Sequence, residues 1–207
     1  MSLRAIIIGL LFVGCSQVWA AEVALVMSVQ GRVLRLGDAA PAPVEAFVKL
    51  KEGDRLSLEK DTRLQVVYFE NGRQETWSGP GRLDMTAREG KASGLSPAQV
   101  KQLPLVMAKQ LARTPALDSH GRGGVTRLRA VRSPDALAKL ESTYQDLRTT
   151  AGRDELGPEA YLLSALLEIR ELDQIDKMLA NMQLDWPNNA EAAQLISLYR
   201  KAVKDSR

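Results

Sequence analysis

The chain has very little cysteine and histidine, two of the residues that most often carry out chemistry in proteins. Its 207 residues include one cysteine, Cys15, and one histidine, His120. Disulfide frameworks and sites for zinc or other transition metals need more of these ligands than the chain contains. A hydrolytic triad is not indicated either, because Asp118 and Ser119 adjoin His120, whereas a triad needs side chains converging from separate elements. We therefore predict a non-enzymatic protein without metal or cofactor.

The sequence also lacks an apolar run of the roughly 20 residues that a membrane-spanning helix needs. A shorter apolar stretch, Ala5 to Val13, follows Arg4 and precedes the small-residue cleavage pattern Val18-Trp19-Ala20. This order is typical of a secretory signal peptide. It predicts that residues 1–20 are removed and that the mature protein is periplasmic.

Cys15 leaves an alternative location open. It follows Leu11-Phe12-Val13-Gly14, which resembles a bacterial lipoprotein box, although Phe12 stands where leucine is usual. If a lipid is attached to Cys15, the protein is associated with the membrane as a lipoprotein. If the cleavage site after Ala20 is used, Cys15 leaves with the signal peptide.

Acidic and basic residues nearly balance over the whole chain but not within its middle. Without residues 1–20, 27 basic and 25 acidic side chains remain, whereas residues 96–135 carry 7 basic side chains against 2 acidic ones. Two interpretations of this segment stay open: a solvated basic connector, or a binding site for an acidic partner. Nucleic acid is not expected as a partner of an exported protein. The residues that would form the partner site are Arg122, Arg127, Arg129 and Arg132.

The N-terminal half has the pattern of short β-strands. Apolar and polar residues alternate between Lys49 and Met85, as in strands with one buried face and one wet face. Asn71-Gly72 between two such runs is a strong hairpin signal. The pattern predicts a small antiparallel β sandwich or roll, with strands over residues 22–36 (interrupted at Gly31), 44–50, 55–58, 63–69, 73–77 and 82–86.

Three groups of residues carry a family resemblance. These are Gly31-Arg32-Val33, the turn Gly53-Asp54-Arg55-Leu56, and the strand Thr62 to Val66 followed by Phe69-Glu70-Asn71-Gly72. Together they resemble the FecR-type periplasmic domain over about residues 23–86. The resemblance implies an exported sensing or scaffolding module. It transfers no catalytic or binding residue, because the family motif consists of structural glycines and turns.

From Ser96 the apolar residues recur at helical spacing. Ser96, Pro97 and Gln99 have the spacing of a capping box and predict a helix that Pro104 breaks before Leu105 to Arg113. Further helices are predicted from Ser133, from Pro158 as the buried centre, from an Asp173 cap, and from an Asn188 cap. The predicted fold is therefore α+β, with a C-terminal array of helical hairpins.

The last helices resemble tetratricopeptide repeats over about residues 157–204, as a stacked helical hairpin and not a full superhelix. Pro158-Glu159-Ala160-Tyr161 and Asn189-Ala190-Glu191-Ala192 begin equivalent helices, two residues short of the 34-residue period of that repeat. The resemblance implies a protein-binding surface. The predicted division is a signal peptide (1–20), a FecR-like β domain (21–94), a basic helical or loop connector (95–133) and a TPR-like helical domain (134–207).

Trp77 and the strand carboxylates are the remaining candidates. Trp77 is expected to close the β core, with an exposed aromatic platform for a partner as the alternative. Glu70, Glu75 and Asp84 are expected to face solvent. The sequence as a whole predicts a protein–protein interaction module, acting as an envelope adaptor or signalling accessory. The alternative is binding of a glycan, peptidoglycan or other envelope ligand by the β domain.

Overall fold

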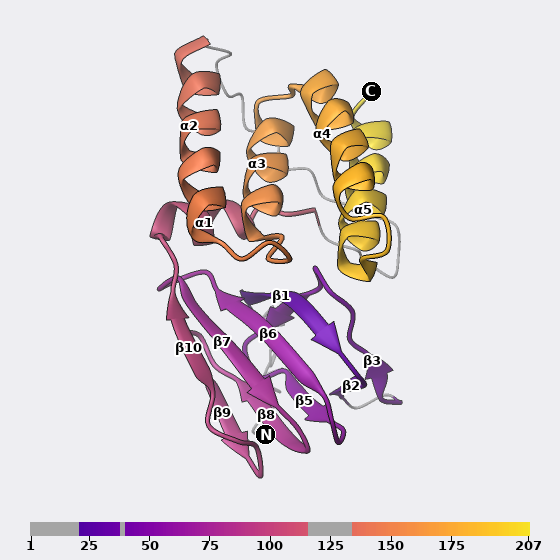
Figure 1. Ribbon diagram of the computed structural model, residues 1–207. Helices are drawn as coiled ribbons and strands as arrows, with labels where there is room; N and C mark the ends of the chain where they lie inside the picture. The colour runs from indigo at the N-terminus through magenta and orange to yellow at the C-terminus, as the bar shows by residue number, and fades with distance from the viewer. Residues whose placement is uncertain (1–20, 38–39, 116–133) are drawn as a thin grey trace, which may run out of the picture.

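The computed structural model describes residues 21–37, 40–115 and 134–207. The predicted signal peptide with Cys15, the histidine His120 and the four arginines of the basic segment lie outside these residues. The described chain consists of two five-stranded antiparallel sheets followed by five helices on one side of them (Figure 1). This arrangement confirms the predicted α+β fold class.

The two sheets share one apolar core. The first sheet, called sheet A, has the strand order β10-β7-β6-β1-β4, and the second, sheet B, has the order β3-β2-β5-β8-β9. Sheet A contains β1 (Glu22–Gln30), β4 (Lys49–Lys51), β6 (Arg63–Tyr68), β7 (Arg73–Ser78) and β10 (Gln99–Gln102). Sheet B contains β2 (Val33–Leu36), β3 (Ala42–Pro43), β5 (Arg55–Leu58), β8 (Gly81–Met85) and β9 (Gly90–Ser93). The alternating residues Leu64, Val66 and Tyr68 are fully buried in this core, as their period of two predicts.

The predicted hairpin at Asn71-Gly72 is confirmed between β6 and β7. Gly72 has a φ of 69°, a conformation that favours glycine, and an added Cβ would lie 2.7 Å from the Leu103 carbonyl oxygen. The Leu103 N–H in turn donates to the Gly72 carbonyl at 2.9 Å. The turn therefore also holds the segment that follows β10.

Two predicted elements differ in the structure. Residues 96–103 do not form a helix, because Gln99–Gln102 pairs with β7 as strand β10, which gives its backbone groups partners in the sheet. The strand predicted over 44–50 shortens to β4, because Phe47 adopts a φ of 60° and turns the chain while its side chain stays buried. Strands β3 and β9 were not predicted.

The five helices are α1 (Leu105–Leu111), α2 (Pro134–Thr150), α3 (Gly157–Glu168), α4 (Leu172–Asp185) and α5 (Ala190–Ser206). Every residue of α3 from Gly157 to Leu166 is buried, which confirms its prediction as the centre of the helical half. Two predicted caps are wrong. The N-cap of α4 is Glu171, two residues before the predicted Asp173. Helix α5 is capped one residue later than predicted, by Asn189, whose side chain accepts from the Ala192 N–H at 2.8 Å.

A second apolar core joins sheet A to the helices. Leu25, Met27 and Val67, which point to the outer side of sheet A, belong to the same buried cluster as residues of α1, α3, α4 and α5. The β and helical halves therefore share a hydrophobic interface rather than a mere covalent link. Among the described residues, none of the helices has the length and apolar content needed to cross a membrane.

Candidate functional site

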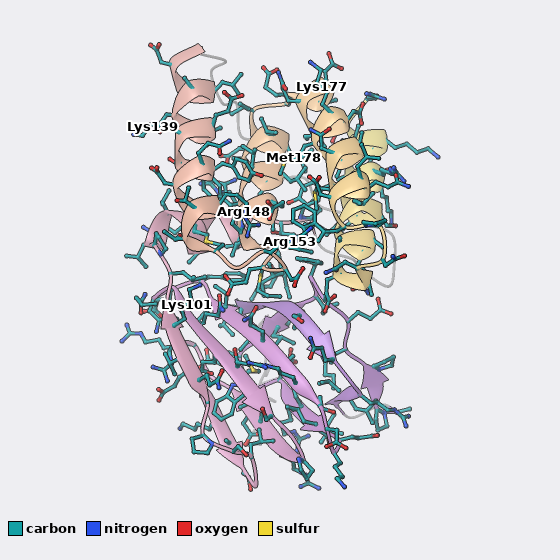
Figure 2. The ribbon with its side chains drawn as sticks, in the orientation of Figure 1. Lys101, Lys139, Arg148, Arg153, Lys177 and Met178 are labelled. Atoms are coloured by element: carbon teal, nitrogen blue, oxygen red, sulfur yellow. The ribbon has the colours of Figure 1, made fainter. Side chains whose placement is uncertain are left out.

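A cleft of about 690 Å³ lies between sheet A and the helices. Its floor is formed by β1, β6, β7 and β10, and its opposite wall by residues 151–158, which comprise the α2–α3 connection and the first residues of α3. Figure 2 shows Lys101, Arg148 and Arg153 along this boundary. The cleft is therefore built from segments that are far apart in the sequence.

The floor of the cleft is a row of uncharged polar side chains. Strand pairing places Ser28 opposite Gln65, Gln65 opposite Thr76, and Thr76 opposite Gln99. Residues opposite one another in neighbouring strands point to the same face. Four adjacent strands thus present one continuous row of hydroxyl and amide groups, here called the polar row: Ser28, Gln65, Thr76 and Gln99. The first three of these line the cleft.

One end of the cleft is apolar. Leu103 and Leu156 line this end. Met27 and Met107 close the cleft there, and the Met107 methyl group would lie 2.4 Å from a Cβ added to Gly157. Glycine at position 157 thus allows helix α3 to start directly against Met107.

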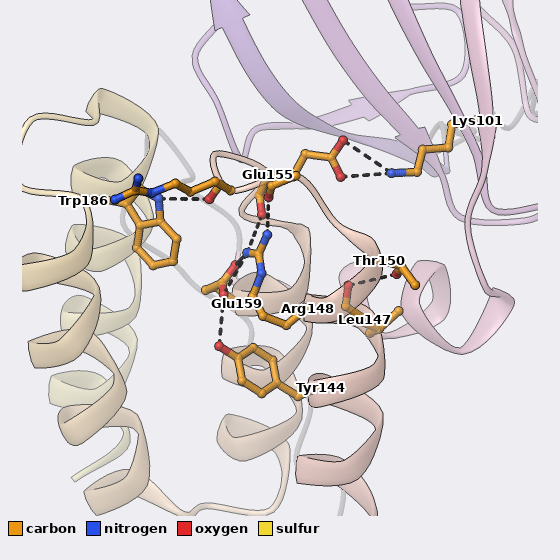
Figure 3. A network of polar contacts seen from close by, with 10 residues as sticks. Lys101, Tyr144, Leu147, Arg148, Thr150, Glu155, Glu159 and Trp186 are labelled. Atoms are coloured by element: carbon orange, nitrogen blue, oxygen red, sulfur yellow. Dashed lines mark hydrogen bonds and ion pairs between the residues drawn. The ribbon is translucent and has the colours of Figure 1, made fainter.

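Arg148 holds the opposite wall in place. Its guanidinium donates to the Glu155 carbonyl oxygen at 2.9 Å and to the Gly152 carbonyl oxygen, and it forms an ion pair with Glu159 at 2.9 Å (Figure 3). The Glu159 side chain is only 1% exposed and also accepts a hydrogen bond from the Tyr144 hydroxyl at 3.1 Å. One buried carboxylate therefore orients the arginine that shapes the 151–158 wall.

Two polar contacts cross from the sheet to the helical half. The Lys101 ammonium lies 3.0 Å from the Glu155 carboxylate, as Figure 3 shows. The Ser28 hydroxyl donates to Glu191, in the first turn of α5, at 2.9 Å. These contacts tie the sheet to the helical half at the Ser28 end of the polar row and at Lys101, on the strand that carries its other end.

Trp77 and Glu75 lie away from the cleft, in the core between the two sheets. Trp77 is 6% exposed, the core position that its sequence context favoured, and its indole N–H donates to Glu75 at 3.0 Å. The expectation that Glu75 faces solvent is wrong, because its side chain is fully buried. It accepts further bonds from the Arg73 guanidinium at 2.6 Å and from the Gly90 N–H at 3.0 Å. Three donors thus compensate the buried carboxylate.

The cleft residues were not predicted as a site. The alternation over Arg63–Tyr68 implies one wet face that includes Gln65, and this signal was present in the sequence. The 151–158 wall gives no such signal, because only tertiary packing brings it over the sheet. Within the part of the chain that the structure describes, no group of three or more histidine, cysteine, aspartate or glutamate side chains is arranged to hold a metal ion.

Comparisons with protein families, with curated proteins and with solved structures give no match. The likenesses to the FecR-type domain and to tetratricopeptide repeats therefore stay predictions from the sequence.

All four tyrosines have a raised pKa. Burial is the main cause in each, and it raises the pKa of Tyr144 to about 12. The negative charges of Glu75 and Glu159 act in the same direction as burial and contribute to the raised pKa of Tyr68 and Tyr144, respectively. The folded chain therefore keeps tyrosine hydroxyls protonated at a pH at which the unfolded chain ionises them, near 10.

This difference predicts a loss of stability in alkali. The tyrosine contribution is fully present below about pH 10 and falls as the pH rises toward the folded pKa values, about 12 for Tyr144. Near-ultraviolet absorbance of tyrosinate, followed against pH, should rise later for the native protein than for the protein in urea. Coincident titration curves would contradict this prediction. The Glu75→Gln variant should lower the pKa of Tyr68, because the neighbouring negative charge is removed.

Proposed function

We propose that this chain is an exported, non-enzymatic protein-binding module that holds a polypeptide segment of another envelope protein in the cleft. The polar row is the observation that carries the proposal. Its hydroxyl and amide side chains can both donate and accept hydrogen bonds, as the backbone of an extended polypeptide requires. A role as an envelope adaptor or signalling accessory follows from this binding together with the predicted export.

The apolar end of the cleft supports the same ligand class. Met27 and Met107 are flexible and polarizable, so they can adapt to an apolar side chain of the bound segment. A site with an apolar end and a few convergent polar groups is typical of binding clefts. The contacts of Lys101 with Glu155 and of Ser28 with Glu191 hold the cleft open without a ligand.

Site-specific photo-cross-linking in the envelope tests this proposal. A photoreactive residue replaces Gln30, which lines the cleft, and in a control protein it replaces Lys91, exposed on sheet B. We expect a discrete cross-linked protein from position 30 and not from position 91. The Gln65→Arg variant, which fills the polar row, should reduce that product by about tenfold, equivalent to 1.4 kcal/mol of binding free energy.

Two results would refute the cleft as the binding site. One is the same set of products from positions 30 and 91, and the other is a product that Gln65→Arg leaves unchanged while the fold is intact. Sedimentation of the purified protein with cell-wall sacculi tests the alternative of a glycan or peptidoglycan ligand. If the protein co-sediments with sacculi and Gln65→Arg abolishes this binding, the ligand of the cleft is a cell-wall component and not a polypeptide.

A further inference from the structure

Strand β10 leaves one edge of sheet A open. It is the terminal strand of the order β10-β7-β6-β1-β4, and all four of its residues are exposed. Figure 1 shows β10 at the border of the sheet, leading directly into α1. An open strand edge is a template on which another chain can form a further strand.

The register identifies which backbone groups are free for such pairing. Leu103 donates its N–H toward the β7 side, to Gly72. Because the direction of the backbone groups alternates along a strand, Gln99 and Lys101 also point to β7, whereas Val100 and Gln102 point outward. The open edge thus offers the N–H and C=O groups of Val100 and Gln102.

Exposed apolar side chains gather at the same edge. Val100 is 49% exposed, and just beyond the strand Leu105 and Val106 are 49% and 54% exposed on α1. These are three of the four large apolar side chains that are exposed among the described residues. A partner strand next to β10 can cover Val100 with an apolar side chain of its own, on the face that Val100 shares with Glu75.

The positive charge around this edge favours an acidic partner. Residues 96–115 include Lys101, Lys109 and Arg113 and no acidic residue, and Arg63 reaches the edge through a hydrogen bond to Gln99 at 3.2 Å. Lys101 and Arg113 are ion-paired with Glu155 and Glu168. No ion pair involves Lys109 or Arg63 in the described part of the chain. Pairing two copies of this basic edge brings like charges together, whereas an acidic strand is attracted to it.

We propose that β10 is a docking edge for an extended, acidic segment of a partner protein, which adds a sixth strand to sheet A. This inference rests on the proposed protein-binding role but uses the sheet edge instead of the cleft. The segment places apolar residues on the Val100 face and acidic residues on the Lys101 face. Backbone hydrogen bonds supply affinity in this mode, and the alternating side chains supply specificity.

The test uses the full mature chain and a short synthetic peptide of alternating valine and glutamate. Peptide binding should shift the amide signals of Val100 and Gln102 and slow their hydrogen exchange. Val100→Pro removes an outward N–H that makes no bond within the sheet, so the fold should persist, and the affinity should fall by at least about tenfold. Val100→Thr keeps this N–H and a β-branched side chain, and should retain most of the affinity.

Several results would overturn the inference. It fails if Val100→Pro leaves peptide binding unchanged, or if a peptide of alternating valine and lysine binds equally well. It also fails if the chain self-associates through β10, with Val100→Pro abolishing the self-association and the acidic peptide not binding. Gln65→Arg, two strands away in the cleft, should leave the affinity for the peptide unchanged. The experiment therefore distinguishes a failure of the docking proposal for β10 from a failure of the binding proposal for the cleft.

Discussion

Replacement of Glu75 by alanine is expected to lower the free energy of unfolding by about 3–5 kcal/mol, because it takes the acceptor from two N–H donors, each costing roughly 1–3 kcal/mol when left unpaired in the core. The Glu75 side chain has no exposed surface and accepts bonds from Arg73, Trp77 and Gly90. Without it, an indole N–H and a backbone N–H lose their acceptor in the core between the sheets. Urea unfolding followed by tryptophan fluorescence measures the loss.

A matched control lies in the same hairpin. Glu70 pairs with Arg88, but these side chains are 49% and 70% exposed. Glu70→Ala should therefore cost no more than about 1 kcal/mol. Glu75→Gln keeps an acceptor for the indole and should fall between the two alanine variants. If Glu75→Ala and Glu70→Ala lower the free energy of unfolding equally, the burial of Glu75 does not determine its contribution to stability.

The fold was predictable where local signals and tertiary packing agree. The alternation through Leu64 and Val66 and the Asn71-Gly72 turn give the β6–β7 hairpin from the sequence alone. The helix predicted at Ser96 failed because a capping-box spacing is a local signal, whereas β10 is stabilised by pairing with β7, over 20 residues away. Long-range strand pairing leaves little trace in a short polar segment such as Gln99–Gln102.

The candidate site was less predictable than the fold. Alternation implies that Gln65 faces away from the core, but not that Ser28, Thr76 and Gln99 continue its row, because this depends on the register of four strands. For Glu75 the sequence predicts an exposed side chain where the structure has a buried one. Its neighbours suggested a solvated strand position, but Trp77, two residues along the same strand face, turns that position into the core.

Arg148 is expected to control both the stability and the shape of the cleft. Arg148→Ala leaves the carboxylate of Glu159, only 1% exposed, without its cation and should cost about 3–5 kcal/mol. It also removes the bonds to the carbonyl oxygens of Gly152 and Glu155, which hold the 151–158 wall. Arg153→Ala is the control, because this exposed arginine lies in the same wall and its contact with Trp186 uses the backbone carbonyl. A change within about 0.5 kcal/mol is expected for this control.

A second substitution separates the two roles of Arg148. In Arg148→Ala combined with Glu159→Gln, the uncompensated charge is gone, so the free energy of unfolding should recover in part, as measured by urea unfolding. The carbonyl oxygens of Gly152 and Glu155 still lack the arginine, so the wall stays loose. If Arg148 positions the wall, the double variant should regain stability but not the cross-linking from position 30. Recovery of both together would show that Arg148 acts on binding only through overall stability.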